Sequence, residues 1–198
     1  MKKTEQPATS KGSSTRDRIV KEARKQLVEH GYEAFVMREL EDILGIKLGI
    51  KLGNLQYYFK TREVLIVHVM EQEAAKDVLA IQSLRQNWYA ADDAFSAIVR
   101  NLVTRWRGDS GVLFSTLGTL SMHNKSYKQL YLNIYRDFYL ALEGPLQEMK
   151  PNLSDDEIAL RVRLITALID GSSMQTQVGS VQDYLDQVQV QAEAIALG

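Results

Sequence analysis

Apolar residues recur along most of the chain at intervals of three and four, the period of an amphipathic helix with one buried face. The first such segment starts near Ser14 and carries Ile19, Ala23 and Leu27 on one stripe. Gly31 follows the last apolar position and is placed to end the helix in a left-handed cap, which glycine adopts without strain. The pattern therefore predicts a long first helix from Ser14 to the residue before Gly31.

Three further helices are expected in the first half of the chain. Short apolar patterns predict helices over residues 37–44 and 54–59. A longer helix begins after Thr61, whose side chain can cap its first turn, and its apolar positions continue to Leu84. That length suits a helix that links two domains.

The helical period continues to the C-terminus. Gly144 and Pro145 are expected to kink or interrupt one of these helices, because proline lacks a backbone donor and clashes with the preceding turn. Ser154 and Glu157 have the spacing of a capping box, and Ser180 is placed to cap the last helix. No segment alternates with a period of two, so the sequence predicts an all-α fold with about nine helices.

Charge is divided unevenly along the chain. The net charge is −1, but residues 1–60 contain 12 Lys and Arg against 8 Asp and Glu, a net of +4, which leaves −5 for the remainder. A basic N-terminal part is typical of proteins that contact nucleic acid, although an excess of this size is also unremarkable. Residues 1–13 have almost no large apolar side chain, and we interpret them as a flexible basic arm.

The composition excludes several kinds of site. The chain has no cysteine, so it has neither disulfides nor thiolate metal sites. No apolar stretch approaches the roughly 20 residues that cross a bilayer, and we expect a cytoplasmic protein with no membrane partner. His30, His68 and His123 are far apart in sequence and no glycine-rich phosphate loop is present, so we expect no metal, no cofactor and no enzymatic activity. Convergence of Asp170 with His123 in the folded chain is the enzyme alternative that stays open.

Residues 45–53 form a perfect tandem repeat, Gly-Ile-Lys-Leu-Gly-Ile-Lys-Leu-Gly. A period of four is far shorter than the roughly 20 to 50 residues of architectural repeats. We interpret it as a local duplication. It lies between the second and third predicted helices, where a change of length alters how the two helices are joined.

Four segments around this repeat resemble the N-terminal domain of TetR-family transcriptional regulators. They are Gly31-Tyr32-Glu33-Ala34, Arg38-Glu39-Leu40, Leu44-Gly45-Ile46 and the run from Gly53 to Leu65. The likeness covers about 50 residues and implies a homodimeric repressor that releases a double-stranded DNA operator when a small molecule binds. It also implies a helix-turn-helix domain over residues 14–62 and a helical ligand-binding and dimerisation domain over residues 63–198.

The chain departs from this family pattern in three ways. Glu41 stands where a small residue is usual, and Val36 or Met37 stands where a capping Thr or Ser is common. Gln56 replaces a frequent aromatic residue at the start of the recognition helix. One copy of Gly-Ile-Lys-Leu completes the pattern, whereas this chain has two.

The candidate DNA-contacting residues flank and include the repeat. Asn54 and Gln56 could contact base edges, whereas Tyr57, Lys60 and the amides near Gly53 suit phosphates. The alternative for the aromatic residues that follow Gln56 is packing in a three-helix core, which we favour for Phe59. The predicted set is Lys47, Lys51, Gly53, Asn54, Gln56, Tyr57 and Lys60.

The second copy is expected to impair DNA binding more than folding. If the extra copy were wound onto a helix, four residues would add about 6 Å of rise and a net rotation of about 40°, so the buried face would be nearly preserved. If it lengthened the turn instead, loop closure would cost only about a few tenths of a kcal/mol beyond the ordering of the new residues. Base contacts depend on hydrogen-bond geometry in both half-sites of a dimer and are less tolerant. Our hypothesis is a variant regulator with weakened or lost operator binding. The alternative is a helical small-molecule-binding or interaction protein that no longer reads DNA.

A small-molecule pocket is expected among aromatic residues and methionines of the C-terminal part, with Arg105, His123, Asp170 or Gln175 as polar anchors. The alternative for each residue is ordinary core. The predicted pocket set is Trp88, Trp106, Phe114, Met122, His123, Tyr127, Tyr131, Tyr135, Asp170 and Met174.

The last two helices carry more apolar residues than one-sided burial needs, which makes them candidates for a four-helix dimer interface. Intrachain core is the alternative for each residue, and the family resemblance implies the two-fold dimer. The predicted interface set is Val162, Ile165, Leu168, Ile169, Leu185, Val188 and Ile195.

Overall fold

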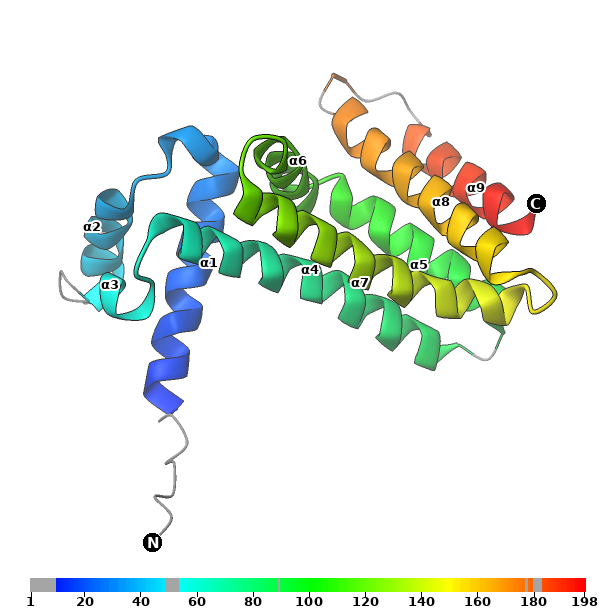
Figure 1. Cartoon of the computed structure of the whole chain (residues 1–198), viewed down its shortest axis with the longest axis horizontal. Helices are drawn as coiled ribbons and strands as arrows, with labels where there is room; N and C mark the ends of the chain where they lie inside the picture. The colour runs from blue at the N-terminus through cyan, green and yellow to red at the C-terminus, as the bar shows by residue number, and fades with distance from the viewer. Residues whose placement is uncertain (1–9, 49–53, 89, 177, 180–182) are drawn as a thin grey trace, which may run out of the picture. The chain divides into compact units, whose positions relative to one another are not determined.

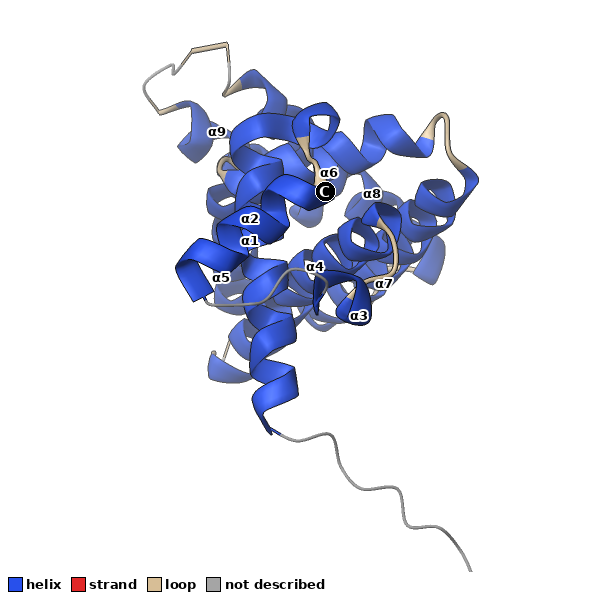
Figure 2. Ribbon diagram, turned by 90° about the vertical axis from the view of Figure 1, so that its left-hand side faces the viewer, coloured by secondary structure: helices blue, strands red, loops and turns tan. Residues whose placement is uncertain are grey.

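The computed structural model describes residues 10–48, 54–88, 90–176, 178–179 and 183–198. These residues form nine α-helices and no strand, which confirms the predicted all-α fold (Figures 1 and 2). The chain divides into two compact units, Met1–Val69 and Met70–Gly198. The division falls inside helix α4 (Arg62–Asn87), whereas the sequence placed the domain boundary at residue 62, where this helix begins.

The first unit is built from α1 (Ser10–Ala34), α2 (Met37–Leu48), α3 (Asn54–Tyr58) and the start of α4. Helix α1 begins at Ser10, four residues before the predicted start at Ser14. Its predicted stripe is the buried face. The side chains that share the core of this unit are Ile19, Ala23, Leu27, Phe35, Leu40, Leu44, Leu55, Phe59, Leu65 and Ile66.

Gly31 interrupts the regular geometry of α1. Its φ of 79° lies in the region that favours glycine, and the regular helix therefore ends at this position, as its place in the sequence predicts. The following residue, Tyr32, is held by Arg62 at the start of α4. The guanidinium of Arg62 donates to the Tyr32 carbonyl and lies 4.0 Å from the centre of the Tyr32 ring. These contacts join the end of α1 to the start of α4.

The second unit contains the rest of α4 with α5 (Ala91–Trp106), α6 (Asp109–Ser121), α7 (Lys125–Met149), α8 (Asp155–Gln175) and α9 (Tyr184–Leu197). Helix α5 contacts α6, α7, α8 and α9, and α8 also packs against α7 and α9. Apolar side chains of these helices form one buried cluster that includes Phe95, Leu102, Phe138, Val162 and Ile169. The predicted helical stripes of this region therefore face a common core.

The close approach of α6 to α5 needs glycine at Gly111, in the first turn of α6. A Cβ atom at this position would lie 1.9 Å from the carbonyl oxygen of Trp106 and 3.0 Å from Cβ of Ser173. The backbone of α6 thus approaches α5 more closely than a side chain at this position permits, and its distance to α8 is also short.

Of the two effects expected at Gly144 and Pro145, a kink or an interruption, the interruption is absent. Helix α7 continues past it to Met149, and the amide of Lys150 still donates to the carbonyl of Leu146 at 2.9 Å. Both Pro145 and Leu146 are buried. Burial in the core offsets the one backbone hydrogen bond that proline removes.

Two helix starts follow the capping rules. Ser154 accepts from the amide of Glu157 at 3.4 Å and the Glu157 carboxylate accepts from the amide of Ser154 at 3.0 Å, so the predicted capping box is confirmed. Asn124 caps α7 by accepting from the amides of Ser126 and Tyr127. Helix α9 starts at Tyr184, and the predicted cap Ser180 lies outside the described residues.

None of the described helices carries an apolar stretch of the length that a membrane crossing requires. Within the same residues, no group of three or more His, Asp or Glu side chains is arranged to hold a metal ion.

Candidate functional site

Helix α2 includes the first copy of the repeat. Leu40 and Leu44 are buried on its inner face, and Gly45 to Leu48 continue the helix by four residues beyond the predicted end at Leu44. Ile46, in this added turn, is 88% exposed. Residues 49–53, which hold the second copy, lie outside the described residues.

Helix α3 has one buried and one exposed side. Leu55 and Phe59 are buried, whereas Tyr57 is 82% exposed and packs edge to face against Tyr58 at 5.2 Å between ring centres. The ring of Phe59 lies 5.6 Å from that of His68. Phe59 is therefore a packing residue of the three-helix core, as the sequence favours.

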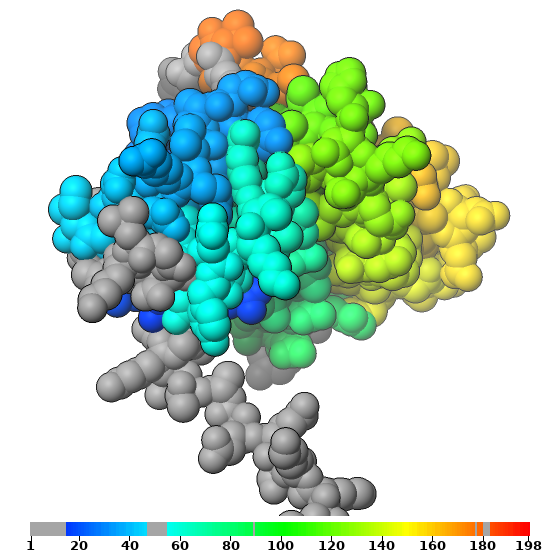
Figure 3. Space-filling model, turned by 60° about the vertical axis from the view of Figure 1, so that its left-hand side comes forward, coloured from blue at the N-terminus to red at the C-terminus, as the bar shows by residue number. Residues whose placement is uncertain are grey.

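Three of the predicted DNA-contacting side chains are exposed on the first unit: Gln56, Tyr57 and Lys60. Figure 3 draws the described residues of this unit in blue and cyan. For Lys47 and Asn54 only the helical backbone is described, and Lys51 and Gly53 lie outside the described residues.

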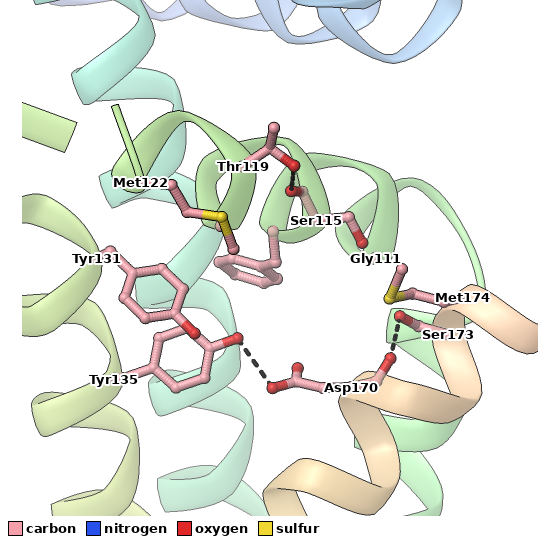
Figure 4. Close-up of a pocket in the computed structure, with 11 residues that line it drawn as sticks. Gly111, Ser115, Thr119, Met122, Tyr131, Tyr135, Asp170, Ser173 and Met174 are labelled. Atoms are coloured by element: carbon pink, nitrogen blue, oxygen red, sulfur yellow. Dashed lines mark hydrogen bonds between the residues drawn. The ribbon is translucent and has the colours of Figure 1, made fainter. Parts of the chain in front are cut away.

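A cavity of about 260 Å³ opens between α6, α7 and α8 in the second unit (Figure 4). Six of the predicted pocket residues meet there: Phe114, Met122, Tyr131, Tyr135, Asp170 and Met174. The sequence missed the residues of α6 and α8 that complete the lining, namely Gly111, Ser115, Gly118, Thr119 and Ser173. The four on α6 share one helix face with Met122, and that spacing of small and polar residues was the available signal.

Four predicted pocket residues lie elsewhere. Trp106 is buried against Phe114, with ring centres 4.8 Å apart, and Tyr127 is also fully buried, so both are core residues. Trp88 lies beyond the end of α4 and is 48% exposed. His123 lies in the exposed turn after α6, so its proximity in sequence to Met122 does not bring it to the cavity.

Asp170 and Tyr135 form the polar centre of the cavity. The hydroxyl of Tyr135 donates to Oδ2 of Asp170 at 3.0 Å, as Figure 4 shows. Burial raises the pKa of Asp170 to about 7, although the hydrogen bond from Tyr135 opposes this rise. Burial also raises the pKa of Tyr135, so its hydroxyl stays protonated. The rings of Tyr131 and Tyr135 lie against each other, with centres 4.3 Å apart.

A second polar cluster, which the sequence pattern did not reveal, is buried behind the cavity wall. Glu73 and Asp77 of α4 are 1% and 0% exposed. Nε of Arg105 donates to Asp77 at 2.5 Å, and the hydroxyl of Ser110 donates to Glu73 at 2.6 Å. Arg105 therefore pairs with these carboxylates and does not line the predicted pocket. The signal in the sequence was the position of both acids, four residues apart, on the apolar stripe of α4.

The predicted dimer-interface residues need correction. Val162, Ile165, Ile169 and Val188 are buried within the chain's own core, so they have no surface left for a partner. Leu168, Leu185 and Ile195 are partly buried against the same core. The large apolar side chains that α8 and α9 leave exposed are Leu160, Leu164, Met174, Val190 and Leu197.

No protein-family model matches the sequence, and the search of curated proteins finds no relative. Solved structures do match. A TetR transcription regulator from Haloarcula marismortui is 14% identical, with a TM-score of 0.77 over 93% of this chain and 97% of that one. Reduced NemR from Escherichia coli is 16% identical, with a TM-score of 0.76 over 91% of this chain and 96% of that one.

A transcriptional regulator from Saccharomonospora viridis, solved in complex with choline, is 17% identical, with a TM-score of 0.73 over 92% of this chain and 95% of its own. At these identities the likeness concerns the fold. The chain has the fold of the TetR-type transcription regulators.

Proposed function

We propose that this protein is a ligand-responsive, DNA-binding transcriptional regulator of the TetR family, acting in the cytoplasm as a repressor that a small molecule releases. The observation that carries the proposal is a structural match to TetR-type regulators over more than nine-tenths of the chain. We assign it no enzymatic role.

The proposed DNA surface is that of α2 and α3. In a helix-turn-helix the second helix enters the major groove while the first crosses the backbone. Gln56 is exposed on α3 and could pair with adenine, whereas Tyr57 and Lys60 suit phosphate contacts. The net charge of +4 over residues 1–60 favours the same partner.

The repeat is proposed to weaken operator binding. Its first copy adds a turn to α2, and Ile46 in that turn is 88% exposed. The connection between the two helices sets the angle at which α3 meets the groove. A chain with one copy would retain Leu40, Leu44, Leu55 and Phe59 as its core.

An electrophoretic mobility shift experiment tests both proposals. This chain and a chain lacking residues 49–52 are titrated onto DNA from upstream of the protein's own coding region at one salt concentration. We expect the one-copy chain to bind at least about tenfold more tightly, which corresponds to about 1.4 kcal/mol. Equal binding by the two chains would contradict the hypothesis that the repeat weakens operator binding. If neither chain binds in a salt-dependent manner, the regulator proposal fails.

We propose a homodimer formed by the outer faces of α8 and α9. Leu160 and Leu164 lie one turn apart on α8, and Val190 and Leu197 lie two turns apart on α9. All four are about half exposed in the single chain. A two-fold axis would bring these faces together as a four-helix interface.

The second candidate function is a helical small-molecule-binding protein that no longer reads DNA. The cavity favours it, because all of its lining lies in the second unit and is separate in sequence from the repeat. A related fold was solved with choline in the Saccharomonospora viridis protein. Thermal stabilisation by small molecules without any DNA binding would favour this alternative.

A further inference from the structure

Among the described residues, the cavity lining has an acidic side chain and no basic one. Asp170 is its only ionisable carboxylate, and no Lys, Arg or His lines it among the described residues. The described hydrogen-bond partner of the Asp170 side chain is the neutral hydroxyl of Tyr135. By contrast, the buried Asp77 has the guanidinium of Arg105 beside it. A carboxylate in a partly buried cavity without a counter-cation is costly, and a bound cation would supply the missing charge.

The cavity lining also carries aromatic rings and flexible thioether side chains. Tyr131 and Tyr135 stack at 4.3 Å, and Phe114 lines the cavity from α6. Ring faces attract an ammonium group within about 6 Å, by about 0.5 to 2 kcal/mol depending on its hydration. Met122 and Met174 add adaptable thioether side chains at the rim (Figure 4). These groups suit the apolar substituent of a ligand.

We propose that this cavity binds a small organic cation, an amine or quaternary ammonium with one apolar substituent, whose charge lies between Asp170 and the tyrosine rings. The volume of about 260 Å³ accommodates a compact molecule such as a phenylethylamine. The assignment of this cation as the effector rests on the proposed regulatory function, whereas the inference that the cavity binds it does not. An anionic ligand is disfavoured, because it would meet the Asp170 carboxylate without a basic partner in the lining.

The charge preference can be measured on the full chain by titration calorimetry at pH 8, where Asp170 is mostly ionised. The probes are 2-phenylethylammonium, 2-phenylethanol and phenylacetate, which share a ring and chain and differ in charge. We expect the ammonium to bind at least about tenfold more tightly than the alcohol, and phenylacetate to bind most weakly. Equal or tighter binding of the alcohol or the anion would overturn the proposal without any variant.

Substitution then locates the charge. Asp170→Asn keeps the size of the side chain and an acceptor for Tyr135, and it should reduce ammonium affinity at least about tenfold while leaving the alcohol unchanged. The exposed acid Asp186 on α9 gives the control, because Asp186→Asn should leave all three affinities unchanged. An unchanged ammonium affinity in Asp170→Asn would contradict the assignment.

Mobility shifts on the same preparations keep the two proposals apart. If the chain binds its upstream DNA but shows no preference for the ammonium, only the cation proposal fails. If the preference is present and neither this chain nor the chain lacking residues 49–52 binds DNA, the cation proposal stands and the regulatory function fails.

Discussion

The indole nitrogen of Trp106 donates a hydrogen bond of 3.0 Å to Oδ2 of Asp77, and this bond ties α5 to α4 inside the second unit. The other carboxylate oxygen of Asp77 accepts from Arg105. Burial raises the pKa of Asp77, while the hydrogen bond and positive charge of Arg105 lower it. A buried acid therefore depends on two donors from a single helix.

Removing this acid should be strongly destabilising. Asp77→Ala leaves Trp106 Nε1 without its acceptor and deprives Arg105 of its nearer carboxylate. Breaking a buried pair of this kind costs about 3 to 5 kcal/mol. We expect a loss of about 3 kcal/mol in the free energy of unfolding, measured by urea denaturation followed by circular dichroism. Asp186→Ala, at an exposed site on α9, should change it by less than about 0.5 kcal/mol. A loss in Asp77→Ala as small as that control would show that the cluster does not stabilise the fold.

Stability should fall as pH rises between about 4 and 7, in part through Asp170. In the unfolded chain this carboxyl releases its proton near its ordinary pKa of about 3.9. In the folded chain the pKa is about 7, so between these values the folded state holds a proton that the unfolded state has released. The stability that this group contributes is complete below the unfolded pKa and is lost as pH rises through the folded pKa.

The titratable groups around Asp170 belong to α7: Tyr131, Tyr135 and Tyr139. Arg163 lies 5.4 Å from the ring of Tyr139, and α6 contributes no charged lining residue. Asp170→Asn removes the titrating group. Denaturation at pH 5 and pH 8 should show a loss in the parent chain that exceeds that of the variant by on the order of 2 kcal/mol. Parallel losses in the two proteins would assign the pH effect to other groups.

Gly111→Ala should unfold the second unit or force α6 away from α5. Its Cβ would lie 1.9 Å from the Trp106 carbonyl oxygen, which is backbone and cannot rotate away. We expect a loss of at least about 3 kcal/mol. Gly171→Ala is the matched control, because Gly171 lies in α8 and a Cβ atom added there would meet nothing within 4 Å. That change should raise the free energy of unfolding by up to about 1 kcal/mol. The melting temperatures of the two variants are compared at one protein concentration. Equal melting temperatures would contradict the close approach of α6 to α5.

Leu164→Glu should separate the proposed dimer without unfolding the chain. Leu164 is 49% exposed, so a carboxylate there is solvated in a monomer but buried in a dimer through α8. Sedimentation should show about half the mass of the parent protein with unchanged helical content. Leu140→Glu, at a 60% exposed site on α7, should leave the mass unchanged. A dimeric Leu164→Glu protein would move the interface away from this face.

Local patterns predicted the features whose cause is local. The positive φ of Gly31 and the capping box of Ser154 and Glu157 depend on residues within one turn, and the structure confirms both. Pro145 failed as a helix breaker because its cost is offset by core contacts that sequence spacing does not contain.

The features that the sequence did not predict depend on contacts between residues that are far apart in the chain. Periodicity identifies Val162 and Ile165 as apolar-face residues, but it does not say whether that face meets the same chain or a partner. Two of the acids of α4, Glu73 and Asp77, occupy its apolar stripe, and the structure explains them by their contacts with Arg105 of α5. Aromatic composition similarly could not separate Trp106, which is core, from Tyr131, which lines the cavity.

The opposite environments of the two tryptophans give this protein an internal optical reporter. Trp106 is 3% exposed and stacks on Phe114, which lines the cavity, whereas Trp88 is 48% exposed. In a Trp88→Phe protein, all indole emission would come from the residue that contacts both the cavity wall and Asp77. Emission wavelength and quenching could then follow the occupancy of the cavity in solution without an added dye.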